Sequence, residues 1–318
     1  MASIVGGSFD PIENQNIDAE QSTLIRDFLD RIGVSEGAIE TVAIESSDNS
    51  SGIENLQPFV ISEATPAATV LAPDGEQISI SLDPESAAGQ ILIVQGVGDA
   101  LITGGSGGDK VHAGSGDDLV RGGVGSDYLA GGLGDDIIYG NTESDTLFAG
   151  DGADSLFGGQ GEDCISGGDD SDFLMGNKGA DIVYGNTGDD IIYGNQQNDV
   201  VYGGAGSDTL YGGQNDDTLE GGRGDDVLHG NLGGDQFVFR TNSDVDVIYD
   251  FVAGTDTIRV ANGINGLSVA EPGDLASRIS SDAQGNAVID FGNGNVVTID
   301  GLSANDLLGD ISSFISVG

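Results

Sequence analysis

The chain has 318 residues, 54 of them acidic and nine of them lysine or arginine, so its formal net charge is −45. This charge disfavours nucleic acid and anionic membrane surfaces as partners, because both are polyanions. No run of 18 apolar residues occurs, so the sequence predicts no membrane span. The single cysteine, Cys164, cannot form an internal disulfide, and the fold must be stabilised by other means.

Residues 1–94 are expected to form a small α+β or mostly β domain. The segment DAEQSTLIRDFLDRIG places its apolar residues on one helical face, with Asp18 as N-cap and Gly33 as the end of the helix. Strands are expected at PFVIS, ATVLA, QISISL and ILIV, with ATVLA and QISISL joined through Pro73-Asp74-Gly75. The first residues, MASIVGGSFDPIENQ, contain neither a basic segment nor an apolar segment of a secretory signal peptide.

A nine-residue repeat governs the middle of the chain. From Gly104 to Val238, fifteen consecutive copies read approximately Gly-Gly-x-Gly-x-Asp-x-apolar-x. Position six is aspartate and position eight is apolar in all fifteen copies. Residues 95–103 resemble a decayed copy, with Ala100 in place of the aspartate. The regular register excludes a flexible acidic linker, which would not keep its apolar residues in phase.

The repeat predicts one turn and one short strand per copy. Position two is only glycine or asparagine, the residues that best tolerate a positive φ, so it is expected in the left-handed region. The first six residues are expected to form the turn and the last three the strand. Strand side chains alternate between faces, so position eight should point inward and positions seven and nine outward.

Stacked copies can bury a core that one copy cannot. Two copies form one coil, which gives two parallel sheets with the position-eight side chains between them. Each aspartate then lies next to the aspartate 18 residues further on, and such carboxylates repel each other unless a cation lies between them. Calcium suits this place, because it accepts six or more oxygen ligands in flexible geometry and glycine turns offer backbone carbonyls.

These copies resemble the RTX (repeats-in-toxin) calcium-binding β-roll, whose nonapeptide is Gly-Gly-x-Gly-x-Asp. The resemblance covers residues 95–260 and implies a mainly β fold, a parallel β-roll over residues 95–238 with several Ca²⁺ ions along both edges. It assigns metal binding to Asp109, Asp118, Asp127, Asp136, Asp145, Asp154, Asp163, Asp172, Asp181, Asp190, Asp199, Asp208, Asp217, Asp226 and Asp235. Glu143, Asp170, Gln197 and Asn215 replace the position-four glycine and depart from the pattern.

Residues 239–318 are expected to form a β-rich C-terminal cap. The segment DVIYDFVAGTDTI, from Asp246 to Ile258, is similar to the segment that commonly follows RTX rolls. The segment NAVIDFGNGNVVTIDG predicts a hairpin that turns at Gly292-Asn293-Gly294. The resemblance implies that this region carries an uncleaved signal for type I export, and therefore an extracellular or cell-surface location without an N-terminal signal peptide.

No catalytic constellation stands out, and we expect no enzymatic activity. The chain has no His-Glu-x-x-His motif, and GGSGG at Gly104–Gly108 lacks the strand, helix and histidine partner of a nucleophile elbow. The two histidines, His112 and His229, fall at position nine of their copies, where ordinary surface residues are expected. A secreted enzyme with an unrecognised N-terminal catalytic domain is the least favoured alternative.

Two functions remain. The first is a secreted structural protein of the cell surface or extracellular matrix that folds and self-assembles on calcium binding. The second is a calcium-dependent adhesin or glycan-binding module that acts through residues 1–94, with an extracellular polysaccharide as partner. The first is favoured because the even-numbered copies carry outward apolar residues on one sheet, and such strips usually mark a contact surface. They include Leu119, Ile137, Tyr139, Phe157, Phe173, Met175, Ile191, Tyr193, Tyr211 and Val227.

Overall fold

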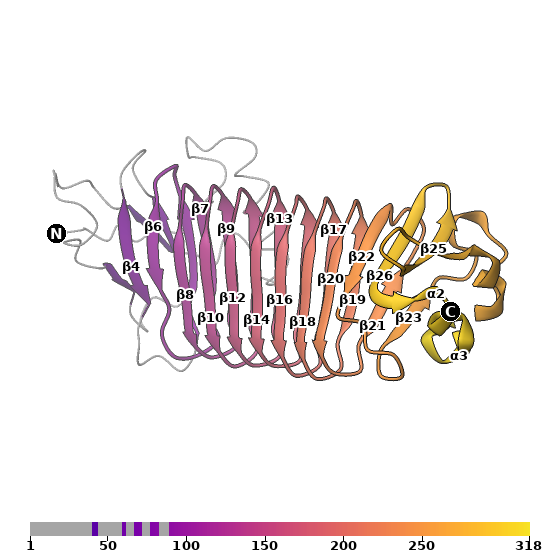
Figure 1. The fold of residues 1–318 in the computed structure, drawn as a ribbon. Coiled ribbons are helices and arrows are strands. Elements are labelled where there is room, and N and C mark those ends of the chain that lie inside the picture. The colour runs from indigo at the N-terminus through magenta and orange to yellow at the C-terminus, as the bar shows by residue number, and fades with distance from the viewer. Residues whose placement is uncertain (1–39, 44–58, 62–66, 72–76, 83–88) are drawn as a thin grey trace. The chain divides into compact units, whose positions relative to one another are not determined.

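A computed structural model describes residues 40–43, 59–61, 67–71, 77–82 and 89–318. The fold is mainly β, a parallel β-solenoid, as the repeat predicts (Figure 1). The chain divides into two compact units, Met1–Cys164 and Ile165–Gly318. The helix expected from Asp18 to Gly33 lies outside the described residues, so the α+β character of residues 1–94 stays a prediction.

The first unit contains two parallel sheets, and successive strands alternate between them. One sheet contains β1 (Glu40–Ala43), β3 (Ala67–Leu71), β5 (Ile91–Gln95), β7 (Lys110–Ser115), β9 (Tyr128–Leu133) and β11 (Thr146–Asp151). The other contains β2 (Phe59–Ile61), β4 (Ile78–Leu82), β6 (Ala100–Thr103), β8 (Leu119–Val124), β10 (Ile137–Thr142) and β12 (Ser155–Gln160). Strand β13 (Cys164–Asp169) begins at the residue where the units divide.

The strands before residue 95 stack in the same two sheets as the repeats. The predicted strands at PFVIS, ATVLA, QISISL and ILIV are present as β2, β3, β4 and β5. Strands β3 and β4 are consecutive in the chain, and the predicted join at Pro73-Asp74-Gly75 lies outside the described residues. The two strands do not pair with each other, because β3 pairs in parallel with β5 and β4 pairs in parallel with β6. Each strand therefore pairs with the strand one coil away, and the next strand in the chain lies in the other sheet.

The second unit continues the same alternation and ends in an antiparallel segment. One sheet contains β15 (Ile182–Thr187), β17 (Val200–Ala205), β19 (Thr218–Arg223), β21 (Gln236–Phe239), β23 (Thr257–Val260) and β27 (Ile315–Val317). The other contains β14 (Phe173–Lys178), β16 (Ile191–Gln196), β18 (Thr209–Gln214), β20 (Val227–Leu232), β22 (Val245–Tyr249), β26 (Asn295–Ser303), β25 (Asn286–Gly292) and β24 (Ile279–Ser281).

The predicted C-terminal hairpin is present. Strands β25 and β26 pair antiparallel, and Asn293 and Gly294 between them have φ of 57° and 90°, as a type I′ turn requires. Four short helices complete this segment: η3 (Ile264–Gly266), η4 (Pro272–Arg278), α2 (Ala304–Gly309) and α3 (Ile311–Phe314). Among the described residues, no helix has the length and apolar character that crossing a membrane requires.

The core consists of the position-eight side chains, as predicted. All fifteen of them, from Val111 to Phe237, have an exposed fraction of 0%. The strands are longer than the expected three residues: most contain six, because positions one to three of the next copy continue the parallel pairing. In β16 and β18, for example, Tyr193 pairs with Tyr211 and Asn195 with Gly213. The turn therefore consists of positions four to six alone.

The turns have the left-handed residues that the sequence predicts. Position two has a positive φ in all copies after the first, including Asn195 at 84°. Position four has a positive φ as well in every copy except the last, which the sequence did not predict. The four residues that replace glycine there, Glu143, Asp170, Gln197 and Asn215, have φ of 72° to 79°. These replacements thus keep the backbone conformation of the turn.

The expectation for His112 is wrong. Its exposed fraction is 4%, and burial lowers the pKa of its imidazole to about 4. It pairs with Ile93 of β5 on one side and Ala130 of β9 on the other, and Ile93 is itself completely buried. Periodicity assigns position nine to the outer face of the sheet, but it does not reveal where that face is covered.

Candidate metal centre along the turns

The structure brings the repeat aspartates into rows at the edges of the sheets. All fifteen predicted residues have exposed fractions of 1–3%. Within each unit, the backbone N–H of one aspartate donates to Oδ1 of the aspartate one coil later. The N–H of Asp118 donates to Asp136 at 2.8 Å in the first unit, and the N–H of Asp190 donates to Asp208 at 2.9 Å in the second. Each carboxylate therefore uses one oxygen to hold the preceding turn.

The second carboxylate oxygen is buried without a hydrogen-bond partner in much of the rows. This holds for Oδ2 of Asp118, Asp127, Asp136, Asp145, Asp190, Asp199, Asp208, Asp217, Asp226 and Asp235. Leaving a buried acceptor unsatisfied costs about 1–3 kcal/mol, and more when the group is charged. Ten repetitions of this cost indicate that the rows are built to receive another group.

The position-one glycines let these oxygens lie close against the backbone. A Cβ on Gly122 would collide with Oδ2 of Asp127 and, at 2.9 Å, with the carbonyl oxygen of Gly140 one coil later. A Cβ on Gly212 would likewise collide with Oδ2 of Asp217 and, at 2.9 Å, with the carbonyl oxygen of Gly230. Beside each such glycine, a carboxylate oxygen and a backbone carbonyl oxygen therefore lie close together.

The protein environment raises the pKa of the row carboxylates. For Asp136, burial is the main cause, the charges of Asp118 and Asp154 add to it, and the pKa rises to about 9. For Asp199, burial raises the pKa to about 8, although the N–H of Asp181 counteracts part of the rise. Rows of ionised carboxylates are thus unfavourable at neutral pH unless protons or cations neutralise them.

These observations fit a hard cation. The donors beside each position-one glycine are carboxylate and carbonyl oxygens, the ligands that calcium prefers. Left-handed turns can present several carbonyls at once. In the part of the chain that the structure describes, no group of three or more His, Cys, Asp or Glu side chains is arranged to hold a metal. A site here must accordingly combine one or two carboxylates with backbone carbonyls.

Two further aspartates continue the rows and were not predicted from the sequence. The N–H of Asp226 donates to Oδ1 of Asp246 at 3.1 Å, and the N–H of Asp235 donates to Oδ1 of Asp256 at 3.0 Å. Their spacings of 20 and 21 residues break the nine-residue register. The sequence nevertheless contains a sign of their role, because Asp246-Val247-Ile248 and Asp256-Thr257-Ile258 repeat the Asp-x-apolar pattern of the copies.

In each unit, the carboxylate at the end of one row is fully hydrogen-bonded. Asp109 accepts from the N–H of Gln90 at 2.7 Å and from the N–H of Gly105 at 3.0 Å. Asp256 accepts from the N–H of Asp235 at 3.0 Å and from the N–H of Val252 at 2.7 Å. In these two residues both oxygens are used by the protein, whereas the interior carboxylates keep one oxygen available.

The comparison with family models agrees with this geometry. A model of the RTX calcium-binding nonapeptide repeat, four copies long, matches residues 103–138, 139–174, 166–201, 175–210, 202–237 and 211–245. Together these segments run from residue 103 to residue 245, so Asp246 and Asp256 lie beyond them. No curated protein matches the chain.

Proposed function

Residues 103–245 consist of RTX calcium-binding nonapeptide repeats, and we propose that the chain is a secreted structural protein of the cell surface or extracellular matrix. In this proposal calcium binding folds the roll, and the folded roll then self-assembles into a layer, sheath or filament. The proposal assigns no catalysis to the chain.

The aspartate rows support calcium-dependent folding most strongly. With Oδ1 of each carboxylate bound to the preceding turn, Oδ2 and the neighbouring carbonyl are the oxygens that would hold the ion. The repeat aspartates from Asp109 to Asp235 are the proposed ligands, and Asp246 extends one row beyond them. Calcium at these sites would supply positive charge between carboxylates that otherwise repel one another.

Export explains how such a chain avoids folding too early. Its acidic repeats cannot become compact while the cation is scarce, because the charges repel and the ligands are not assembled. Calcium outside the cell would complete the sites and fold the roll. A signal for type I export within residues 239–318 is part of this proposal.

Self-assembly is supported by stacked aromatic rings in each unit, here together called the aromatic strip. In the second unit they are Phe173, Tyr193, Tyr211, His229 and Tyr249, and in the first they are Tyr139 and Phe157. Neighbouring ring centroids lie 4.5 to 5.8 Å apart, close to the spacing of adjacent strands.

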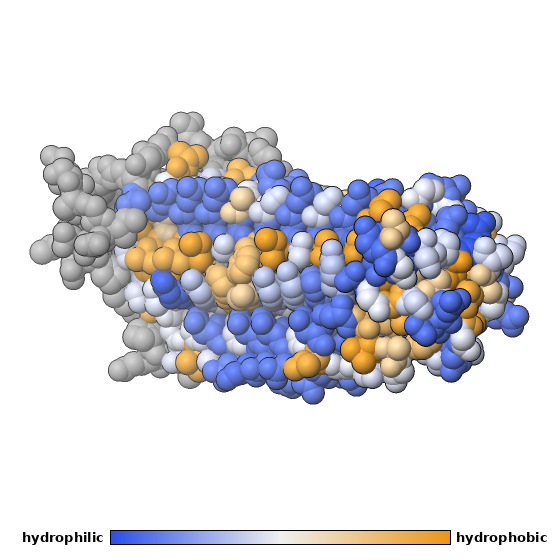
Figure 2. Space-filling model, in the orientation of Figure 1, coloured by the Kyte–Doolittle hydropathy of each residue, from blue (hydrophilic) through white to orange (hydrophobic). Residues whose placement is uncertain are grey.

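Apolar neighbours widen the aromatic strip on the same sheets. Ile137 and Ile191 are 39% and 42% exposed. In Figure 2, apolar and weakly polar residues form a band across the strands that Figure 1 labels β8, β10 and β12, with hydrophilic bands beside it. Such a surface favours contact with another copy, since covering apolar area contributes roughly 25 cal/mol per Å².

Two measurements on the purified full chain test the proposal. Far-ultraviolet circular dichroism should change from a disordered spectrum in chelator to a β-rich one in millimolar calcium. Electron microscopy and sedimentation should then find large assemblies with calcium and none without it. A roll that is fully folded in chelator would overturn calcium-dependent folding, and a monomer in millimolar calcium would overturn self-assembly. The adhesin alternative concerns residues 1–94, most of which lie outside the described ranges, and stays a prediction.

A further inference from the structure

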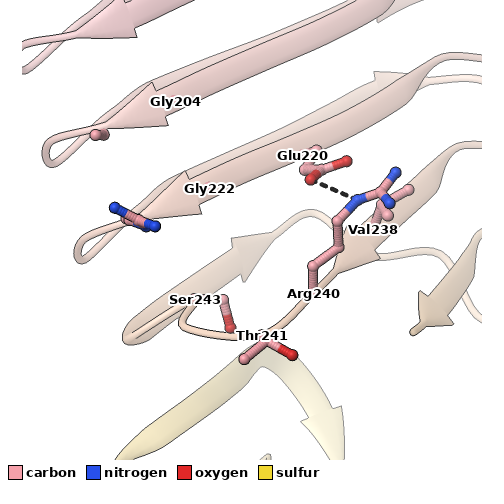
Figure 3. Close-up of a pocket in the computed structure, with 9 residues that line it drawn as sticks. Gly204, Glu220, Gly222, Val238, Arg240, Thr241 and Ser243 are labelled. Carbon is pink, nitrogen blue, oxygen red and sulfur yellow. Dashed lines mark ion pairs between the residues drawn. The ribbon is translucent and has the colours of Figure 1, made fainter. Parts of the chain in front are cut away.

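A cavity of about 330 Å³ lies in the second unit (Figure 3). Its walls come from β17, β19, β21 and the segment that follows β21. Gly204 and Gly222 pair in register on adjacent strands and both line it. A Cβ on Gly222 would collide with the carbonyl oxygen of Gly204, so a side chain at this position cannot fill the cavity.

The cavity concentrates positive charge in a chain that is otherwise strongly acidic. Arg223, at the end of β19, and Arg240, just beyond β21, both line it, although the whole chain has only nine lysines and arginines. Nε of Arg240 lies 2.7 Å from Oε1 of Glu220, the carboxylate in the wall. Among the described residues Arg223 forms no ion pair, so one positive charge remains in excess.

The guanidinium of Arg240 keeps most of its donors available. It contacts Glu220 through Nε, and the side chain is 63% exposed whereas that of Glu220 is 16% exposed. Glu220 therefore holds Arg240 in place from the wall, as Figure 3 shows. A planar guanidinium offers five N–H donors, and the two outer nitrogens can still receive a second oxyanion.

A buried hydroxyl completes the polar lining. Ser243 is 4% exposed, lines the cavity, and its Oγ has no hydrogen-bond partner. The adjacent Thr241 also lines the cavity and accepts from the N–H of Asn265 at 3.4 Å, which leaves its O–H free to donate. Buried hydroxyls are normally satisfied, so an unpartnered one beside two arginines indicates a missing acceptor.

We propose that this cavity binds an acidic saccharide through its carboxylate or sulfate group. Arg223 and Arg240 would bind the oxyanion, and Ser243 would donate to it or to a ring hydroxyl. The volume is at the lower end of small-molecule sites, which suits one sugar residue and exceeds what a small free anion fills. The saccharide, as opposed to a free anion, rests on the proposed extracellular function.

The test measures binding to the calcium-loaded full chain by titration calorimetry. The probes are glucuronate and glucose 6-sulfate, with glucose as the uncharged control and acetate as the free-anion control. Glucuronate and glucose 6-sulfate should compete for one site and bind at least tenfold more tightly than acetate, and glucose should not bind. Arg223→Gln and Arg240→Gln should each weaken binding at least tenfold, and Ser243→Ala several-fold.

Lys178→Gln serves as the matched control, because it removes an exposed cation of the same unit outside the cavity. It should leave binding unchanged. The proposal is overturned if no saturable binding occurs, if acetate binds as tightly as glucuronate, or if Lys178→Gln weakens binding as much as the arginine variants. Circular dichroism in calcium shows whether each variant is folded, so failure of calcium-dependent folding is recognised separately from failure of this site.

Discussion

The backbone N–H of Asp181 donates to Oδ1 of Asp199 at 2.8 Å, and the N–H of Asp199 donates to Oδ1 of Asp217 at 2.8 Å. Asp199 therefore has two separable roles in its row. One oxygen holds the preceding turn, and the other, which has no partner, is the proposed calcium ligand.

Substitutions at Asp199 should separate these roles. Asp199→Asn keeps an oxygen for the N–H of Asp181 but removes the charge, so it should weaken calcium binding. Asp199→Ala removes both, and it should also cost about 1 kcal/mol through the lost hydrogen bond. Calcium titrations followed by circular dichroism measure the first effect, and urea unfolding in saturating calcium measures the second. Equal unfolding midpoints of the two variants in saturating calcium would contradict the assignment of Oδ1.

The position of an aspartate in its row should determine how much its substitution weakens calcium binding. Both oxygens of Asp256 accept backbone hydrogen bonds, whereas Asp199 has one oxygen available. Asp256→Asn should thus raise the calcium midpoint less than Asp199→Asn, because fewer neighbouring sites depend on it. The comparison uses calcium titrations of the two variants side by side. A larger shift for Asp256→Asn would argue against sites shared along the row.

Glycine at position one should be essential for the stability of the roll. Gly203→Ala would place a Cβ against Oδ2 of Asp208 and the carbonyl oxygen of Gly221. We expect it to destabilise the calcium-loaded roll by roughly 1–3 kcal/mol, the usual range for overpacking. Gly273→Ala is the control, because nothing lies within 4 Å of the added Cβ there. Urea unfolding in millimolar calcium measures both variants. Similar unfolding midpoints for the two would contradict the requirement for glycine at position one.

Acid should fold the roll when calcium is absent. The row carboxylates have folded pKa values raised from 3.8 to about 7 for Asp127, about 8 for Asp199 and about 9 for Asp136. Between pH 4 and 9 the folded chain then binds more protons than the unfolded chain, so stability rises as the pH falls. Circular dichroism in chelator should show β-structure gained on acidification from pH 8 towards pH 4. No gain of β-structure on acidification would contradict the raised pKa values.

Assembly should depend on the aromatic strip. Ile191→Asp combined with Tyr193→Asp places two charges on the outer face of β16, where Tyr193 stacks on Tyr211 at 4.5 Å. Light scattering in calcium should show the assemblies dissolve while circular dichroism shows the fold retained. Val200→Asp with Tyr202→Asp makes the matched change on β17 of the opposite sheet and should leave the assemblies intact. If both double variants dissolve the assemblies, the aromatic strip is not the specific contact.

Much of the fold could be predicted because every copy repeats the same local physics. The position-eight residues and the left-handed Asn195 follow from residue type and spacing alone. Strand length did not, because the glycines at positions one and two have low strand propensity and pair only once the neighbouring coil is present. His112 was misjudged for a similar reason, since its burial is decided by parts of the chain that are distant in sequence. Asp246 and Asp256 were missed because insertions in their turns hide the register.

The alternation of strands between two sheets restricts how the gene for such a protein can lengthen. Tyr193 and Tyr211 lie on adjacent strands of one sheet because 18 residues separate them. A tandem duplication of 18 codons adds one complete coil and leaves every later strand in its sheet. A duplication of nine codons preserves the motif yet transfers all later strands to the opposite sheet, and the aromatic row is broken at that point. The unit of viable growth is therefore twice the unit of sequence repetition.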